Sequence, residues 1–436
     1  MIEDFKREVR SNLTDNILPY WLALKDPEGG FYGEVTSDGT VLRDAPRGVI
    51  LNARIIWSFA AAYQAIPDKE YLLAAIHAKD WFLAHFSDHK YGGVYWSVNA
   101  DGSRLDAKKQ LYAQGFAIYG LSELYKVTHD DEVLKAAVNI YRVVEAHFAD
   151  AANGGYIEAL SRDFSPLEDM SLSAHDINAD KTMNSHLHIL EAYANLYTVW
   201  PDAGLKKAVE ALLDIIGTKV MDEAGHLQLY FKRDWSVLPG GISYGHDIET
   251  SWLALECAFA LKDQAVVERV RPWAYAMGLA GNEGLLPDGS MRYERLVTPD
   301  SDRVSYDDSR QWWVQAETVV GNLWLRKYHD GLSSSSSVIS DSSSVISDSS
   351  SVISDSSSVI SDSSSVISSE VEKSQFLLNS IAAWKYIKNN LVDNDGGEWW
   401  WAILPDGSID KANPKAGFWK CPYHNTRMCL QVLNLI

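Results

Sequence analysis

The sequence feature that most constrains the fold is a short glycine-containing loop that occurs six times along the 436-residue chain. Each copy lies between two segments with helical periodicity, and most copies precede a strand-like run and a turn such as Ser37-Asp38-Gly39. Five copies follow one another at intervals of about 60 to 70 residues, and the sixth comes after a longer interval. This recurrence predicts six helical hairpins closed into a ring around one central pocket. The loops begin at Gly29, Gly92, Gly154, Gly225, Gly284 and Gly396.

Apolar residues at positions i, i+3, i+4 and i+7 predict twelve helices; one such stripe contains Ile55, Phe59 and Ala62. Short links such as Pro67-Asp68 join a helix to the next, so these neighbours run antiparallel. Because long glycine-rich loops alternate with these links, we expect an all-α (α/α)6 barrel with short β-hairpin loops on one face. The predicted helices span 2–24, 47–66, 69–87, 108–127, 131–149, 182–199, 203–219, 246–261, 264–279, 310–329, 373–392 and 421–434.

We expect one catalytic domain over residues 1–436, interrupted by a serine-rich insertion at 333–369. The insertion repeats Val-Ile-Ser-Asp-Ser-Ser-Ser with a period of seven. It has no sustained a/d stripe, so it is not a coiled coil. It also contains too little apolar surface to offset the entropy of ordering, which predicts a disordered surface loop without a catalytic role.

Composition argues against several classes of function. The net charge of −20 disfavours nucleic acid and anionic membranes as partners. No apolar run is long enough to span a bilayer, and the charged N-terminus does not resemble a signal peptide. Cys257, Cys421 and Cys429 lack disulfide or metal-ligand spacing, which favours reduced thiols in the cytoplasm. Nucleotide-binding glycine motifs and His-Glu-x-x-His are absent from the sequence, so we expect neither a cofactor nor a metal.

Polar or aromatic residues occur early in each helix that follows a long loop. If these are the inner helices, their N-terminal ends open on the same side of the barrel and their side chains converge on one ligand. His246 and Glu249 are three residues apart and share a helix face, where a carboxylate can fix the tautomer of a histidine. The full set is Arg54, Tyr112, Asn184, His188, His246, Glu249, Trp252, Trp313, Glu317 and His424.

Four segments that contain these residues resemble cellobiose 2-epimerases, which belong to the N-acylglucosamine 2-epimerase superfamily. The segments are Met183–Glu191, Gly245–Trp252, Trp312–Glu317 and Trp419–Arg427. The resemblance covers the whole chain except the serine-rich insertion. It implies an (α/α)6 barrel and a metal-free epimerisation at C2 of the reducing-end glucose of β-1,4-linked disaccharides. Cellobiose would then give glucosyl-mannose, and lactose would give epilactose.

The resemblance also implies roles for individual residues. His246 and His424 correspond to an acid/base pair on opposite faces of C2, and His188 to the residue that helps to open the sugar ring. Arg54, Tyr112 and Asn184 correspond to contacts with the oxygens of the reacting sugar. Glu249 and Glu317 correspond to supporting carboxylates, and Trp313 and Trp419 to walls on which the sugar stacks. The complete set of substrate-binding residues predicted in this way is Arg54, Tyr112, Asn184, Glu249, Trp252, Trp313, Glu317 and Trp419.

The chemistry is consistent with these residue types. The C2–H bond of an aldose becomes acidic only after ring opening, because C2 then lies next to a carbonyl. Histidine is a suitable base since its ordinary pKa of about 6.5 is near neutral pH. Inversion needs a second acid/base on the other face, and Arg54 could stabilise the oxyanion of the enediolate.

Other functions on the same barrel stay open at this stage. An aldose–ketose isomerase shares the enediolate but returns the proton to C1, and an N-acylglucosamine 2-epimerase acts on a different sugar. A glycoside hydrolase would need two carboxylates across the scissile bond, for which Glu249 and Glu317 are available. A non-catalytic sugar-binding barrel is a further alternative. The expected partner is a small disaccharide, and the expected assembly is a monomer or a weak homodimer.

Overall fold

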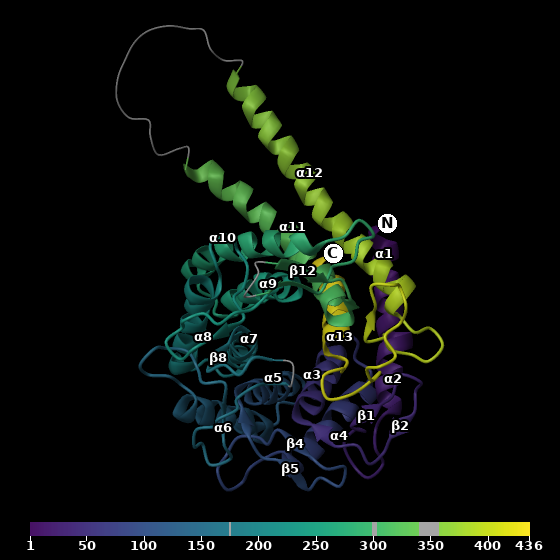
Figure 1. The fold of residues 1–436 in the computed structure, drawn as a ribbon. Coiled ribbons are helices and arrows are strands. Elements are labelled where there is room, and N and C mark those ends of the chain that lie inside the picture. The colour runs from purple at the N-terminus through teal and green to yellow at the C-terminus, as the bar shows by residue number, and fades with distance from the viewer. Residues whose placement is uncertain (174–175, 299–302, 340–356) are drawn as a thin grey trace.

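The computed structural model describes residues 1–173, 176–298, 303–339 and 357–436. Within these ranges the helices form a ring in which each inner helix packs against the next and α13 closes the ring against α3 (Figure 1). The expected (α/α)6 barrel is confirmed. The inner helices are α3 (Val49–Ala65), α5 (Leu111–Thr128), α7 (Met183–Val199), α9 (Tyr244–Ala260), α11 (Trp312–Ile339) and α13 (Tyr423–Leu435).

Each inner helix is covered on its outer side by a partner from the same hairpin. The N-terminal segment serves as the outer partner of α13, so the two ends of the chain complete the sixth hairpin. The outer helices are α4 (Lys69–His85), α6 (Asp131–His147), α8 (Ala203–Ile215), α10 (Gln264–Gly281) and α12 (Ser357–Tyr386). The N-terminal segment consists of α1 (Ile2–Ser11), a π-helical turn (Asn12–Ile17) and α2 (Leu18–Ala23).

The pattern of burial distinguishes the two rings. In α3 every residue from 49 to 62 is buried, and in α5 every residue from 111 to 124 is buried. Outer helix α6 buries one stripe that includes Val133, Ala137 and Val144. A helix that is apolar on all sides belongs in the interior, whereas an amphipathic helix covers it.

Aspartates in the short links start four of the outer helices. Asp68, Asp130, Asp202 and Asp263 are N-caps whose carboxylates accept hydrogen bonds from backbone N–H groups of the first turn. Such a cap stabilises a helix by about 1 kcal/mol. The Pro-Asp links at 67–68 and 201–202 therefore end one helix and start the next, as the sequence predicted.

Short antiparallel strands connect neighbouring repeats at the N-terminal ends of the inner helices. In five cases the two residues before an inner helix pair with a strand of the following repeat. These pairs are β3 (Arg47–Gly48) with β4 (Ser97–Val98), β6 (Lys109–Gln110) with β7 (Ala159–Leu160), β8 (Lys181–Thr182) with β9 (Tyr230–Phe231), β10 (Ile242–Ser243) with β11 (Glu294–Thr298), and β13 (Arg310–Gln311) with β14 (Ala402–Ile403). The remaining strands are β1 (Glu34–Val35), β2 (Val41–Leu42), β5 (Arg104–Asp106) and β12 (Arg303–Asp307).

The recurring glycine loops are attached to the inner helices by buried polar side chains. Gly93 has a φ of +69°, and an added Cβ would lie 2.6 Å from Oε1 of Gln114. The next residue donates its N–H to the same oxygen. Equivalent bonds of 2.8 to 3.0 Å join Val94 to Gln114, Tyr156 to His186, Leu227 to Asp247, and Met291 to Gln315.

The helices beside the serine-rich repeat are longer than the sequence predicted. We expected them to cover 310–329 and 373–392, but α11 extends to Ile339 and α12 begins at Ser357. Serine has only a moderate cost in a helix, and each added residue forms one more hydrogen bond. The centre of the predicted disordered insertion at 333–369, residues 340–356, lies outside the described residues.

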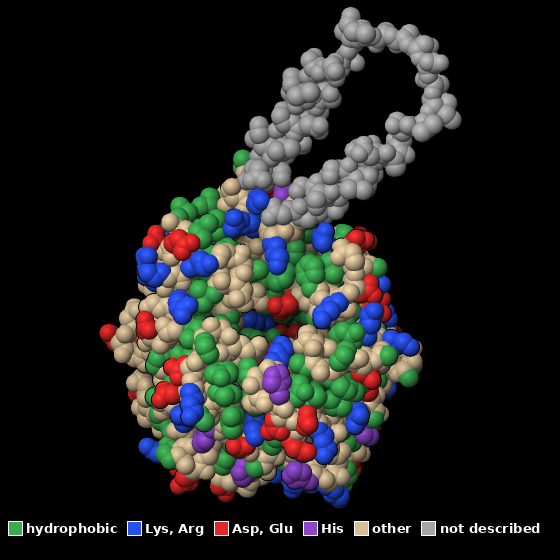
Figure 2. All heavy atoms as spheres, turned by 180° about the vertical axis from the view of Figure 1, so that it is seen from behind, with side chains coloured by type: hydrophobic (Ala, Val, Ile, Leu, Met, Phe, Trp, Pro, Cys, Tyr) green, Lys and Arg blue, Asp and Glu red, His purple; other side chains and the backbone are tan. Residues whose placement is uncertain are grey.

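Charged side chains of both signs are spread over the surface, and some lie together at a hollow near the centre of the face shown in Figure 2. Some ion pairs are fully or almost fully buried beneath the loops, including Lys109 with Asp88, Lys181 with Asp150 and Lys420 with Glu398. Among the described residues, no helix combines the length and hydropathy needed to cross a membrane.

Candidate active site

The six inner helices contribute equivalent residues to one layer of the barrel. In five helices the residue is the sixth of the helix, and in α13 it is the fifth. Neighbours in this layer touch, since the ring of Phe116 lies 4.1 Å from the Arg54 guanidinium and 4.9 Å from the His188 ring. The repeat thus places chemically different side chains around a common axis. The layer contains Arg54, Phe116, His188, Glu249, Glu317 and Arg427.

A cavity of about 600 Å³ lies above this layer, at the N-terminal ends of the inner helices. It is large enough for a small sugar ligand. Nine of the eleven side chains predicted from the sequence line it, and they come from all six inner helices or the segments before them. These are Arg54, Tyr112, Asn184, His188, His246, Glu249, Trp313, Trp419 and His424.

His246 and His424 face the same cavity and are both close to Trp313. The ring of Trp313 lies 4.7 Å from that of His246 and 5.7 Å from that of His424, measured between centroids. The prediction that Glu249 partners His246 is wrong. Nδ1 of His246 lies 2.8 Å from the hydroxyl oxygen of Ser243, because the Glu249 carboxylate turns toward Arg427 on another helix.

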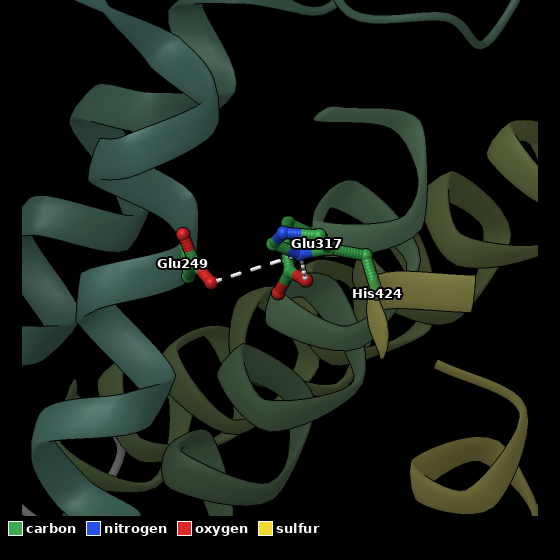
Figure 3. A group of neighbouring side chains, drawn as sticks. All are labelled: Glu249, Glu317 and His424. Atoms are coloured by element: carbon green, nitrogen blue, oxygen red, sulfur yellow. Dashed lines mark hydrogen bonds and ion pairs between the residues drawn. The ribbon is translucent and has the colours of Figure 1, made fainter. Parts of the chain in front are cut away.

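His424 is held by a carboxylate from α11. Its Nδ1 lies 2.8 Å from Oε1 of Glu317 and 3.9 Å from Oε1 of Glu249. Figure 3 shows both carboxylates directed toward the imidazole. Glu317 also accepts a hydrogen bond of 3.0 Å from the indole nitrogen of Trp252. This arrangement fixes the orientation of the imidazole and leaves its other nitrogen for the cavity.

His188 forms a second histidine–carboxylate pair. Its Nδ1 lies 2.6 Å from Oε1 of Glu191, one helical turn along α7. The ring of His188 packs edge-on against Tyr112, whose hydroxyl accepts a hydrogen bond of 2.7 Å from Arg54. The cavity therefore places an imidazole, a phenol and a guanidinium next to one another.

The sequence predicts Trp252 and Glu317 as substrate-binding residues, but neither is among the residues that line the cavity, and Glu317 instead occupies the supporting position that the resemblance implied. Trp252 is fully buried one turn below Glu249, where its ring covers the guanidinium of Arg427 at 4.7 Å. Glu317 is also fully buried. Both side chains support the groups that face the cavity and do not reach it themselves.

Arg427 is the main residue of the site that sequence reasoning missed. Its Nη2 donates to Oε1 of Glu249 at 2.5 Å and to Oε1 of Glu317 at 2.8 Å, and its Nη1 donates to Oε2 of Glu191 at 3.0 Å. One signal was available, since Arg427 lies three residues after His424 on the same helix face. Three buried carboxylates on the inner helices also required a cation.

Burial determines the ionisation of these groups. Desolvation lowers the pKa of His188 and of His246 to about 3, and it lowers that of His424 well below its ordinary value. Desolvation also raises the pKa of the Glu317 and Glu191 carboxyls. The cavity therefore favours neutral imidazoles, which can accept protons. The neighbouring carboxyl groups have raised pKa values and keep a proton to higher pH than usual.

Glu249, Glu317 and His424 offer three potential metal-ligand atoms within 4.8 Å of one another. The guanidinium of Arg427 contacts the same Oε1 atoms of both carboxylates. A fixed positive charge is thus already bonded to two of the three atoms that a metal ion would need as ligands. This geometry favours proton-transfer chemistry by side chains over a metal centre.

Comparison with known proteins identifies the family. The family model described as N-acylglucosamine 2-epimerase (GlcNAc 2-epimerase) matches residues 30–331. A cellobiose 2-epimerase from Bacteroides fragilis is 42% identical over 436 residues, which cover 99% of this chain and 100% of that protein. A cellobiose 2-epimerase from Dictyoglomus turgidum is 32% identical, and the match covers 99% of this chain and 98% of that protein.

Solved structures agree with this assignment. The cellobiose 2-epimerase from Bacillus thermoamylovorans has a TM-score of 0.82 and 33% identity, with 100% of both chains covered. A D-mannose isomerase has a TM-score of 0.76 at 20% identity, covers 99% of this chain and 98% of that one, and shares the fold. The chain belongs to the N-acylglucosamine 2-epimerase family and is an isomerase, as the sequence predicted.

Proposed function

We propose that this protein inverts C2 of the reducing-end glucose of β-1,4-linked disaccharides, converting cellobiose to glucosyl-mannose and lactose to epilactose. The observation that carries the proposal is that two imidazoles from different inner helices, His246 and His424, line one cavity beside Trp313. The likeness to cellobiose 2-epimerases over nearly the whole chain supports the choice of substrate.

The reaction begins with opening of the sugar ring. His188 transfers the proton of the C1 hydroxyl to the ring oxygen, which yields the free aldehyde. The carboxylate of Glu191 fixes the imidazole at Nδ1, so its other nitrogen faces the sugar. Tyr112 and Asn184, which also line the cavity, bind the oxygens of the reacting ring.

The second step removes the proton from C2. One of the two histidines acts as the base, and its neutral form is available because burial lowers its pKa. The electron pair moves toward C1 and creates an enediolate oxyanion. Arg54 cannot deprotonate near neutral pH, and it donates toward this oxyanion together with the Tyr112 hydroxyl that it binds.

The third step returns a proton to C2 from the opposite face. The histidine on that face donates it, which inverts the carbon, and the ring closes again through His188. Trp313 and Trp419 provide apolar walls for the sugar, whose C–H faces stack on aromatic rings. Glu317 supports His424 from behind and does not contact the sugar.

A glycoside hydrolase is a poor fit to the same residues. Its two carboxylates would have to flank a glycosidic bond from opposite sides. Glu249 and Glu317 instead converge on a single nitrogen of Arg427, and Glu317 lies outside the cavity. The aldose–ketose isomerase and the N-acylglucosamine 2-epimerase use a similar enediolate, so their products distinguish them.

The test is incubation of the protein with cellobiose in heavy water, followed by NMR. We expect an intact disaccharide with a mannose-type reducing end that carries deuterium at C2. Release of glucose, a ketose as the main product, or no exchange at C2 would contradict the proposal. N-acetylglucosamine serves as the comparison substrate, and we expect slower turnover than with cellobiose.

The cytoplasmic location and the monomeric or weakly dimeric state stay predictions from the sequence. Light scattering coupled to gel filtration measures the assembly directly. We expect the mass of one 48.7 kDa chain, or of a dimer that dissociates on dilution.

A further inference from the structure

Two histidine–carboxylate pairs of the site are joined by one buried guanidinium. The Arg427 side chain bonds Glu191, which holds His188, and it bonds Glu317, which holds His424. These five residues come from three inner helices, α7, α11 and α13. The histidine assigned to ring opening is therefore linked to a histidine assigned to C2 through Glu191, Arg427 and Glu317.

Arg427 lies in a buried cluster of two guanidinium groups, Arg54 and Arg427, and three carboxylates, Glu191, Glu249 and Glu317. Arg54 and Arg427 are at most 3% exposed, as are the carboxylates of Glu191, Glu249 and Glu317. An unbalanced buried charge is strongly unfavourable, so two cations and three carboxylates favour the retention of one proton. The hydrogen-bonded positions for this proton are the His188–Glu191 pair and the His424–Glu317 pair.

The surroundings of Arg427 contain further ionisable groups. Arg54 lies across the ring of Tyr423, at 4.9 Å from its centroid, and Arg427 lies at 4.3 Å on the same ring. Glu256 and Tyr119 are the next ionisable groups toward the other end of the barrel. The groups that contact Arg427 are Glu191 from α7, Glu249 from α9, Glu317 from α11 and Tyr423 from α13. Glu256 from α9 and Tyr119 from α5 interact with its charge over a longer distance, and Arg54 from α3 packs against the same Tyr423 ring.

We propose that Arg427 is a positioning residue that holds both histidine–carboxylate pairs and keeps one exchangeable proton between them. This proposal rests on the proposed function of the site. In each turnover one histidine takes the C2 proton and the opposite histidine gives a proton to C2. His424 can give a proton only if the cluster retains one, and His188 uses the same cluster when it opens the ring.

A second cavity makes Arg427 accessible to a chemical test. It has a volume of about 570 Å³ and lies among the C-terminal halves of five inner helices, at the opposite end of the barrel from the first cavity. Arg427 and Glu191 line it, together with Trp57, Tyr119 and Glu256. A free guanidinium ion can enter a space of this size and replace a truncated arginine side chain.

The experiment uses the Arg427→Ala and Arg427→Lys variants of the full chain. Two rates are measured with cellobiose: mutarotation, which reports ring opening, and deuterium exchange at C2. We expect Arg427→Ala to lower both rates by about 100-fold or more, because it leaves three carboxylates without their shared donor. Guanidinium at non-denaturing concentration should restore both rates at least about tenfold, whereas urea or sodium chloride should not.

The pH profile separates positioning from a structural role. Loss of a positive charge makes the cluster bind protons more tightly, so the profile of Arg427→Ala should shift to higher pH. Arg427→Lys keeps the charge and should keep the wild-type profile at a reduced rate, since an ammonium cannot reproduce the planar fork. If Arg427→Ala does not fold, Arg427→Lys still tests the proposal, because it should lower both rates while its pH profile stays that of the wild type.

Arg47 offers a matched control, because it is equally buried and pairs with Asp26 outside the cavity. Arg47→Ala should lower stability without a change in the pH profile and without rescue by guanidinium. Loss of C2 exchange with normal mutarotation in Arg427→Ala would overturn the proposal, as would an unshifted profile without rescue. Failure of the wild-type protein to exchange C2–H would instead overturn the proposed function.

Discussion

Replacement of Glu317 by glutamine tests how the carboxylate behind His424 contributes to proton transfer. Glu317 accepts from Trp252 at 3.0 Å and from Arg427 at 2.8 Å, and it lies 2.8 Å from Nδ1 of His424. Glutamine has nearly the same shape but no charge. The substitution therefore removes the negative partner of the imidazolium while the volume stays the same.

The expected magnitude follows from these contacts. A hydrogen bond to a charged group contributes about 1.5 to 3 kcal/mol, which corresponds to a rate loss of about 10- to 150-fold. Deuterium exchange at C2 of cellobiose measures this loss, and mutarotation through His188 should change less. Without the carboxylate His424 holds a proton less tightly, so its pKa falls further. The alkaline limb of the pH profile should move to lower pH.

A carboxylate outside the site provides the control for this substitution. Glu145 accepts hydrogen bonds from the hydroxyls of Tyr156 and Tyr193, and it does not line the cavity. Glu145→Gln should affect stability only. Wild-type exchange and an unshifted pH profile in Glu317→Gln would refute the reasoning that this carboxylate supports the imidazolium.

Three further predictions concern capping, metal dependence and the serine-rich segment. Asp202→Ala removes a cap that accepts two backbone hydrogen bonds, and chemical denaturation should show a loss of about 1 kcal/mol; an unchanged midpoint would contradict the cap. EDTA should leave epimerisation unchanged, since Arg427 occupies the place of a cation between Glu249 and Glu317; a loss restored by a divalent ion would contradict this. Deletion of residues 340–356 should leave the C2 exchange rate within about twofold, because loop length has a small effect on closure; a large loss would contradict the prediction of a non-catalytic segment.

The architecture could be predicted because it depends on local patterns. Apolar periodicity locates helices, and the alternation of long and short links separates inner from outer ones. Asp68 and Asp202 are visible in the sequence as helix starts, and the structure confirms them as N-caps. The predicted end of α11 and the predicted start of α12 were wrong, because a serine-rich sequence has no strong signal that stops a helix.

The contacts within the site could be predicted only in part. Helix spacing correctly indicates that His246 and Glu249 share a helix, but the carboxylate binds Arg427, which is 178 residues away. The sequence also could not show that Trp252 lies behind the cavity. It is one helical turn from Glu249, which lines the cavity, and helix spacing alone does not tell which turn faces the ligand. The spacing of residues along one helix does not show how that helix is rotated relative to its neighbours. This rotation determines which side chains of different helices form hydrogen bonds.

The most direct test of the two-histidine mechanism is proton exchange by single variants in heavy water. Each of His246→Ala and His424→Ala retains one base, which can reach C2 from one face only. We expect each variant to exchange the C2 proton of only one of the two epimers, cellobiose or glucosyl-mannose. The two variants should select opposite epimers, and neither should interconvert them.

Interconversion at the wild-type rate by either variant would contradict the mechanism. Exchange of the same epimer by both variants would also contradict it, because the two imidazoles would then act from the same face of C2.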